Sequence, residues 1–142
     1  MRNFLKTQFS AIPENERLAR QIVASFAIDL NPTVEEICDI KTSVSEAVTN
    51  SIVHGYKGGE GIICMKLECE GMEISVEIED FGTGIEDIEK ARQPLFTTEP
   101  EMERSGMGFT VMESFMDYVD VISEKGNGTK IIMKKVIGNS DE

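Results

Sequence analysis

Positive charge is scarce in this sequence of 142 residues: 14 lysine and arginine residues stand against 26 aspartate and glutamate residues, and the formal net charge is −12. Such a chain lacks the basic surface that holds a nucleic-acid backbone or an anionic membrane. It also lacks any apolar run near the roughly 20 residues of a membrane-spanning helix, and its N-terminus lacks the apolar core of a signal peptide. We therefore expect a cytoplasmic protein whose partners are proteins or small molecules, with no direct contact to nucleic acid or membrane.

Cysteine is scarce as well, with three residues, and histidine occurs once, at His54. Cys64 and Cys69 have opposite parity in one predicted strand and so face opposite ways, while Cys38 lies in a helical pattern. We expect all three to be reduced residues of the hydrophobic core, in agreement with a cytoplasmic location. The length corresponds to one ordinary domain with a single core, 1–142.

Apolar periodicity and turn residues predict, in chain order, a strand, two helices, two strands, a helical stretch, a long loop, a helix and a hairpin. Their approximate ranges are 5–9, 13–30, 33–54, 62–70, 74–80, 86–92, 93–105, 107–116, 118–122 and 129–136, followed by a polar tail at about 138–142. This order predicts a two-layer α/β (α+β) sandwich, with the helices on one face of a mainly antiparallel mixed sheet.

The first predicted helix carries one apolar face at steps of four, formed by Leu18, Ile22, Phe26 and Leu30. Thr33 and Glu36 form a capping-box signature at the start of the second helix. Gly55 is a natural left-handed stop at its end. In the strand at 62–70 alternate residues are apolar, so we expect one face of the sheet to be buried.

Glu46, Asn50 and His54 are the first group of residues that can carry chemistry. They are spaced by four, so they form a polar stripe along one side of the second helix. The stripe brings a carboxylate, an amide and an imidazole into line. Taken alone, it is also explained by a solvated polar face.

The second group is the turn Asp80-Phe-Gly-Thr-Gly84, which follows a buried strand. A carboxylate at this place can accept a hydrogen bond from an exocyclic amine, and the glycines let a flat base lie against the backbone. An ordinary turn after a strand has a similar composition.

The third group is the pair Gly106 and Gly108, where the long loop ends and a helix begins. Free amides and a helix dipole worth roughly half a charge make such a helix start an anion site. The phosphate-loop signature G-x-x-x-x-G-K-[ST] is absent, and a helix cap explains the glycine pair equally well.

Together, the three groups resemble the GHKL ATPase and kinase superfamily, and the resemblance covers nearly the whole chain. Segments 46–55, 80–84 and 104–109 look like its N box, its G1 box and its second glycine box. The resemblance implies a Bergerat-type fold that binds ATP and ADP with magnesium. It also implies that the loop at about 93–105 is an ATP lid.

The resemblance implies a role for each site residue. Asn50 would ligate the magnesium ion, Asp80 would bind the adenine amino group with help from Thr129, and Glu46 would be the catalytic general base. The other cofactor-binding positions, expected around the base and the phosphates, are His54, Gly82, Gly84, Arg104, Ser105, Gly106, Met107, Gly108 and Phe109.

The single histidine and the short length of the chain exclude several branches of this superfamily. Sensor histidine kinases need a phosphoacceptor histidine outside the N box, but His54 is the one histidine, and larger relatives need further domains. What remains is the small serine kinases that act as anti-sigma factors, and segments 45–56 and 91–109 are similar to those of endospore-forming bacteria. The resemblance implies a homodimer that holds the sporulation sigma factor F with ATP and phosphorylates a serine of an anti-anti-sigma protein. The alternatives are a general-stress anti-sigma serine kinase and a nucleotide-gated binding module without useful phosphoryl transfer.

Arg17 and Arg20, three apart on the first helix, are rare basic residues in this acidic chain. They are candidate contacts to a partner protein. Ordinary surface ion pairs with Glu14 or Glu16 are the stronger explanation of both arginines.

Overall fold

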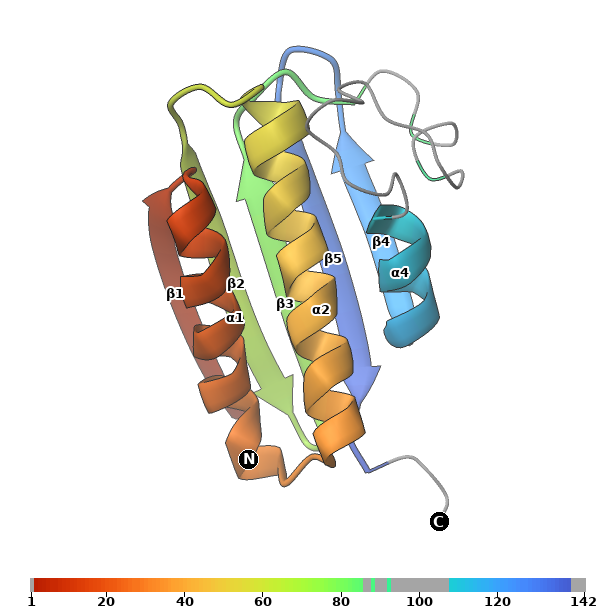
Figure 1. The fold of residues 1–142 in the computed structure, drawn as a ribbon. Helices are drawn as coiled ribbons and strands as arrows, with labels where there is room; N and C mark the ends of the chain where they lie inside the picture. Colours follow the sequence, from red (N-terminus) through yellow and green to blue (C-terminus); the bar gives the residue numbers. More distant parts are fainter. Residues whose placement is uncertain (1, 86–87, 89–91, 93–107, 139–142) are drawn as a thin grey trace.

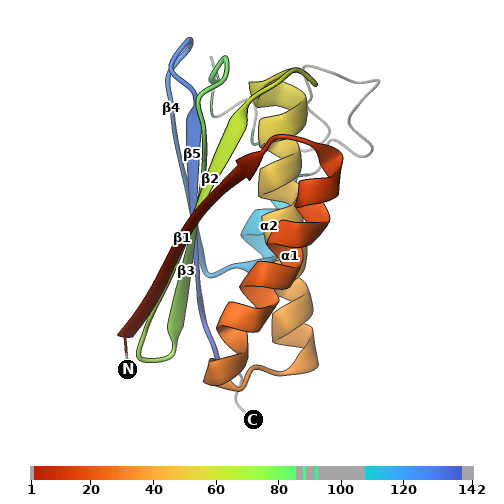
Figure 2. The same cartoon turned by 90° about the vertical axis from the view of Figure 1, so that its left-hand side faces the viewer.

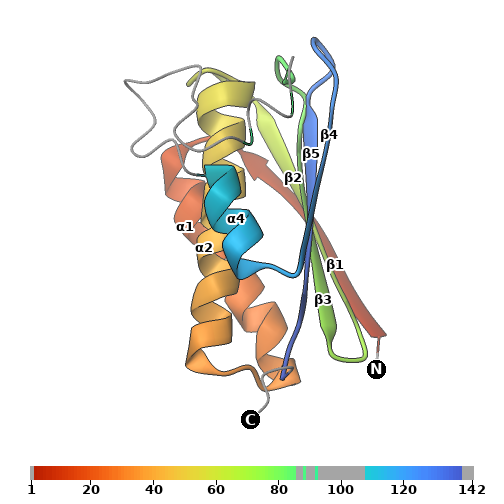
Figure 3. The ribbon, with the colours of Figure 1, turned by 90° about the vertical axis from the view of Figure 1, so that its right-hand side faces the viewer.

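The computed structural model of the protein describes residues 2–85, 88, 92 and 108–138 (Figure 1). Within this part of the chain, one sheet of five strands has the order β1-β2-β3-β5-β4. Helices α1, α2 and α4 all lie on one face of the sheet, and its other face is open (Figures 2 and 3). The elements are β1 (Arg2–Ser10), α1 (Pro13–Ala27), α2 (Val34–Asn50), β2 (Ile62–Glu70), β3 (Glu73–Asp80), α4 (Gly108–Phe115), β4 (Tyr118–Ser123) and β5 (Thr129–Val136).

The predicted two-layer sandwich is confirmed, but the sheet is not mixed. Every pairing between the described strands is antiparallel. The crossover through α4 does leave β3 and β4 pointing the same way, as a parallel connection requires (Figure 1). The hairpin after β4 then places β5 between them, so two strands of the same direction never become neighbours.

Alternation along the strands is confirmed, because the buried side of the sheet carries the apolar residues that the pattern selects. The central strands β2 and β3 bury Ile63, Met65, Leu67, Cys69, Ile74, Val76 and Ile78. The opposite positions of these strands are partly or fully exposed and carry mainly polar and charged side chains, with Ile62 and Cys64 as exceptions. One face of the sheet is therefore the core, and the helices cover it. The expectation that all three cysteines lie in the core was wrong for two of them, because Cys69 is buried but Cys64 is half-buried and Cys38 is exposed.

The predicted apolar face of α1 was wrong at its first position, because Leu18 is 44% exposed. The residues that face the core are instead Ala19, Val23 and Ala27, which are completely buried. Small side chains at these positions let the helix approach the sheet and α2 closely, so the larger Ile22 and Phe26 lie at the margin of the core. The helix also ends three residues early, at Ala27, and a 3-10 turn continues to Leu30.

The capping box at the start of α2 is confirmed. Thr33 Oγ1 accepts from the Glu36 amide at 3.0 Å, and Glu36 Oε1 accepts from the Thr33 amide at 2.9 Å. The end of the helix differs from the prediction, because α2 stops at Asn50 and a π-helical turn covers Ser51–Gly55. The left-handed conformation falls on Lys57 and Gly58, with φ of 53° and 78°, and Gly55 is not left-handed.

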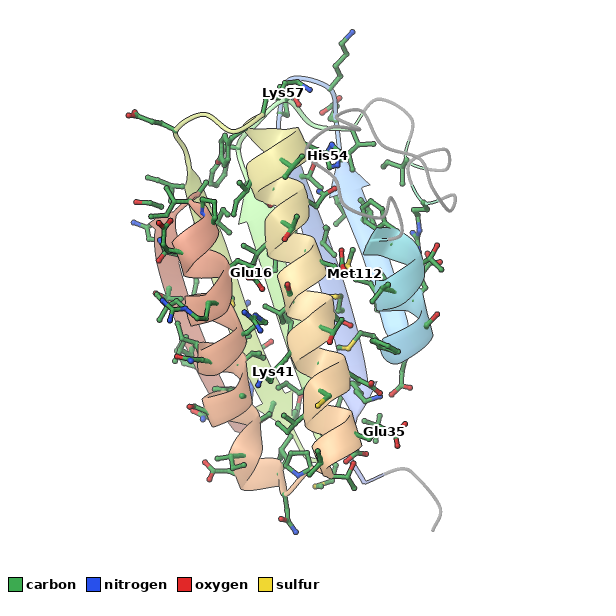
Figure 4. The ribbon with its side chains drawn as sticks, viewed as in Figure 1. Glu16, Glu35, Lys41, His54, Lys57 and Met112 are labelled. Atoms are coloured by element: carbon green, nitrogen blue, oxygen red, sulfur yellow. The ribbon has the colours of Figure 1, made fainter. Side chains whose placement is uncertain are left out.

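The topology brings the ends of several helices and strands together at one end of the molecule. The last turn of α2, the end of β3 and the start of β5 meet there, and Figure 4 shows His54 and Lys57 at this end and Glu35 at the opposite one. No described helix is both long and apolar enough to cross a membrane.

Candidate functional site

Asp80 is the last residue of β3, and it is only 1% exposed. Its Oδ2 accepts a hydrogen bond from Ser51 Oγ at 2.7 Å, and its Oδ1 accepts from the Gly82 amide at 3.0 Å. Burial raises the pKa of the Asp80 carboxyl, and the hydrogen bonds from Gly82, Ser51 and the Thr129 backbone oppose this rise. The carboxylate is thus buried, fixed by donors on both oxygens and placed at the end of the sheet.

Two glycines allow the chain to close tightly around Asp80. A β-carbon built on Gly55 would lie 2.9 Å from three atoms of the Asp80 carboxyl group, and one on Gly82 would lie 2.0 Å from the Gly55 carbonyl oxygen. The Thr83 amide then donates to this same Gly55 oxygen at 2.9 Å. Gly55 is therefore required by the close approach of Asp80, and not by the left-handed conformation that we expected.

The turn between β4 and β5 closes the site from the other side. A β-carbon on Gly128 would lie 2.2 Å from the Asp80 carbonyl oxygen, and one on Gly84, where φ is +77°, would lie 2.2 Å from the Glu124 carbonyl oxygen. Thr129 is 4% exposed, and its hydroxyl lies 2.8 Å from Ser123 Oγ. The structure thus brings together Asp80, Gly84 and Thr129, which are three of the predicted site residues.

Glu46 and Asn50 lie one turn apart on α2, and both side chains are half-buried. A β-carbon built on Gly108, the first residue of α4, would lie 3.2 Å from Glu46 Oε1. The carboxylate therefore faces the start of the helix that follows the second glycine box. His54 belongs to the π-helical turn Ser51–Gly55 that follows α2, so it does not lie on the continuous α-helix that the sequence predicts.

Part of the predicted site falls on residues that the structure does not describe. Arg104, Ser105, Gly106, Met107 and the segment 93–105 lie outside the described residues. Gly108 and Phe109 are described as the first two residues of α4, and Phe109 is 7% exposed and belongs to the hydrophobic core. Of the predicted helical stretch at 86–92, only Ile88 and Arg92 are described, and the Arg92 amide donates to the Ile88 carbonyl at 3.1 Å.

Three polar side chains of the site were missed by sequence reasoning. Ser51 donates to Asp80, and Ser123 Oγ accepts from the Ile85 amide at 2.7 Å and donates to the Gly128 carbonyl at 2.9 Å. The Tyr56 hydroxyl donates to the Ile62 carbonyl at 2.6 Å and accepts from the Phe81 amide at 2.8 Å. The available signal was position alone, since Ser51 directly follows Asn50 and Tyr56 directly follows the segment 46–55 that resembles the N box.

The ion-pair explanation of Arg20 is confirmed, because Arg20 Nε lies 2.6 Å from Glu16 Oε2 on the same helix. Arg17 is exposed. A contact of either arginine with a partner remains a prediction.

The described residues contain no group of three or more histidine, cysteine, aspartate or glutamate side chains that could hold a metal ion. Asn50 offers one hard oxygen ligand at the end of α2. A single amide oxygen fits magnesium only when phosphate oxygens and water supply the other ligands, which is how this ion usually binds beside a nucleotide.

The fold and the arrangement around Asp80 define a histidine kinase-like ATPase domain, and a model of this family matches residues 9–135. Such a domain binds ATP. The chain is 57% identical over 135 residues to the anti-sigma F factor of Clostridium acetobutylicum, covering 95% of this chain and 94% of that protein. It is 53% identical over 142 residues to the anti-sigma F factor of Bacillus cytotoxicus, covering 99% and 97%. The chain therefore belongs to the anti-sigma F factor family.

The fold also resembles a solved structure, the RsbU and RsbW domains of a Mycobacterium tuberculosis protein. The TM-score is 0.69 with 17% identity, covering 95% of this chain and 32% of that chain. At this identity the likeness supports the fold alone.

Proposed function

We propose that this chain is a cytoplasmic, ATP-dependent protein serine kinase that also sequesters sigma factor F. It holds the sigma factor while ATP is bound, and it transfers the γ-phosphoryl group of ATP to a serine hydroxyl of an anti-anti-sigma protein. The serine gains the phosphoryl group, its proton leaves, and ADP is the other product. Phosphorylation inactivates the antagonist, whereas the unphosphorylated antagonist releases the sigma factor.

The position of Glu46 is the observation that supports phosphoryl transfer rather than binding alone. Its Oε1 faces the first residue of α4, where the β-carbon position of Gly108 lies 3.2 Å away. The start of this helix is the side of the site where we place the phosphates, since amides at a helix start attract anions. A carboxylate beside them can accept the proton of the attacking serine as general base.

Within the ATP site, we place the adenine amino group against Asp80 and the magnesium ion on Asn50. The support for the first assignment is the buried, donor-fixed carboxylate, and for the second the hard amide oxygen at the end of α2. Magnesium would neutralise phosphate charge when bound. Calorimetry of Asn50→Ala with and without magnesium tests the assignment, and an unchanged metal dependence would remove Asn50 from the metal shell.

Glu46→Gln tests the kinase proposal. Glutamine keeps the side-chain shape but cannot take a proton near neutral pH, so serine phosphorylation of the antagonist should fall by about 10² to 10⁴. ATP binding, measured by calorimetry, should change little. A variant that phosphorylates at the wild-type rate would show that Glu46 is not the base, and one that also loses ATP binding would assign Glu46 a structural role.

We also propose that the protein is a homodimer. A groove of about 440 Å³ runs between the edge strand β1 and α1, and it is lined by the apolar Leu5, Ile22 and Phe26 and by the polar Asn3, Gln21, Ser25 and Asp29. An edge strand beside such a groove can be covered by a second copy. Sedimentation should give twice 15.8 kDa, and a single-chain mass at micromolar concentration would contradict the dimer.

A further inference from the structure

The Asp80 carboxylate has few acceptor positions left for a ligand. Two carboxylate oxygens offer about four acceptor sites. Ser51 Oγ occupies one on Oδ2 at 2.7 Å, the Gly82 amide occupies one on Oδ1 at 3.0 Å, and the Thr129 backbone also donates to the group. The remaining capacity suits one further donor, such as a single amino group.

Ser51 differs from the other two donors because it is a side chain and can be removed without changing the backbone. It is 1% exposed, so its hydroxyl meets Asp80 without competition from water. The 2.7 Å separation is typical of a hydroxyl that donates to a charged carboxylate. Ser51 begins the π-helical turn, and this turn also holds Gly55 against the same carboxyl group.

The protonation state of Asp80 decides what kind of base it can bind. An ionised carboxylate only accepts hydrogen bonds, whereas a protonated carboxyl group can donate one. At 1% exposure, burial favours the protonated form and raises the pKa of Asp80. The hydrogen bonds from Gly82, Ser51 and the Thr129 backbone oppose this rise and favour the acceptor-only form.

We propose that Ser51 is a specificity-determining residue of the nucleotide site, because its hydroxyl keeps Asp80 in the acceptor-only form that selects a 6-amino purine over a 6-keto purine. Ser51 acts through Asp80 and is thus a positioning residue without ligand contact of its own. This inference rests on the proposed contact between Asp80 and adenine. It adds Ser51 to the residues that determine base selectivity, and it gives the hydrogen bond to Asp80 as the cause.

Other titratable groups belong to the elements packed around Asp80 and would be the same in every Ser51 variant. Glu79 is its neighbour on β3 and raises the pKa of Asp80 by its charge. His54 belongs to the π-helical turn, and Tyr56 directly follows this turn. Lys130 of β5 lies opposite Glu79 in the strand register. A difference in pH dependence between wild type and a Ser51 variant therefore reports on the Ser51 hydroxyl.

The test compares ATP with inosine triphosphate, which carries a keto oxygen in place of the 6-amino group. Wild type should prefer ATP, and Ser51→Ala should reduce this preference on the order of tenfold, since a hydrogen bond to a charged group is lost. Ser51→Thr keeps a hydroxyl and should restore the preference. Ser51→Cys keeps nearly the same shape but has a weaker hydrogen-bond donor, so it should also reduce the preference for ATP. It replaces Ser51→Ala in the test if that variant fails to fold.

The chain offers a matched control in Ser43→Ala. Ser43 lies on α2, is completely buried, and its hydroxyl has no hydrogen-bond partner among the described residues. Removing this hydroxyl deletes the same atom from the same layer of the core. The ratio of ATP to inosine triphosphate affinity should stay at the wild-type value.

The pH profile separates the proposed role from a merely structural one. ATP affinity should rise with pH as Asp80 ionises, and Ser51→Ala should move this rise to higher pH, because removing a donor to the charged form raises the pKa of Asp80 further. Ser43→Ala and Ser51→Thr should keep the wild-type midpoint. A Ser51→Ala protein with both the wild-type midpoint and the wild-type preference would overturn the inference.

Asp80→Asn separates the inference from the proposed site on which it rests. If this variant keeps the full preference for ATP, Asp80 does not bind the base and the proposed adenine contact is wrong. If it loses the preference while Ser51→Ala keeps preference and midpoint, the adenine contact stands and only the role of Ser51 is wrong.

Discussion

At the scale of single residues, the Glu36 carboxylate joins the start of α2 to the end of β5. Glu36 Oε1 accepts from the Thr33 amide and Oε2 accepts from the Gly138 amide, each at 2.9 Å. The hydrogen bond from Thr33 lowers the pKa of Glu36, the Gly138 amide adds to this effect, and burial opposes it. The sequence predicts the capping box, but the contact with Gly138 spans 102 positions and no local pattern reveals it.

We predict that Glu36→Gln lowers the free energy of unfolding by about 1–3 kcal/mol at pH 7. Glutamine has one neutral acceptor oxygen and an NH₂ group, so the Thr33 and Gly138 amides can no longer both donate to a carboxylate oxygen. The pKa of Glu36 is lower in the folded protein, so ionised Glu36 stabilises it above the unfolded value of about 4.3. This stability is lost as the pH falls through the folded pKa. Urea unfolding at several pH values measures the effect.

Glu35→Gln is the control for this prediction. Glu35 stands in the same first turn of α2 but is exposed, so the control removes an equal charge near the helix dipole (Figure 4). We expect a change of at most about 0.3–1 kcal/mol. If the two variants lose the same stability at every pH, the link to Gly138 contributes nothing.

At the scale of elements, the fold was largely predictable, and the failures have physical causes. The alternation of apolar and polar residues correctly predicted the buried side of β2 and β3, because successive side chains of a strand point to only two faces. The helix α1 has neighbouring faces 100° apart, and close packing selected the one with small Ala19, Val23 and Ala27 over the one with Leu18. The π-helical turn was not predictable, because it follows from the contacts of Ser51 and Gly55 with Asp80, which is distant in sequence.

The packing of the G1 turn against the π-helical turn leads to a prediction for Gly82→Ala. The added methyl group would lie 2.0 Å from the Gly55 carbonyl oxygen, a backbone atom that also accepts from the Thr83 amide. Both segments would have to move, so we expect a loss of stability of about 1–3 kcal/mol or more and a large loss of ATP affinity. Urea unfolding and calorimetry measure the two effects.

Gly71→Ala is the matched control, because it adds the same methyl group to a turn in open space. Gly71 has a φ of +61° and no neighbour within 4 Å of its β-carbon position. Its cost should be only the left-handed conformation, about 1–2 kcal/mol, and ATP binding should be unchanged. Equal ATP affinity in the two variants would show that the close approach at Gly82 does not shape the site.

At the scale of the whole molecule, the antiparallel topology brings distant segments of the predicted site to one end of the sheet. The sheet order puts the end of β3 beside the start of β5, so Asp80 and Thr129 are register partners. The helix α2 runs along the same sheet and ends at this side of the molecule (Figure 1), so Asn50, its last residue, and Glu46 one turn earlier belong to this end. The order of the motifs along the chain indicated which residues belong to the predicted site. The distances between these residues depend on how α2, the end of β3 and the start of β5 pack together, which the sequence does not show.

The net charge of −12 is also a property of the whole chain. An acidic protein cannot compete for DNA phosphates, but it can cover a basic surface of a DNA-binding partner. This balance agrees with the proposed capture of a sigma factor by protein contact alone.

The proposed cycle separates capture from chemistry, so Glu46→Gln should uncouple them in the complete system. Capture needs only the folded, ATP-loaded protein, and the variant should therefore hold the sigma factor as wild type does. Added antagonist should release the sigma factor from both proteins. Wild type then phosphorylates the antagonist and recaptures the sigma factor, whereas the variant leaves the antagonist active and the sigma factor free. Phosphoserine formation and sigma capture, followed over time in one preparation, measure both halves of the cycle. Recapture by a variant that forms no phosphoserine would mean that antagonist phosphorylation does not drive the return of the sigma factor.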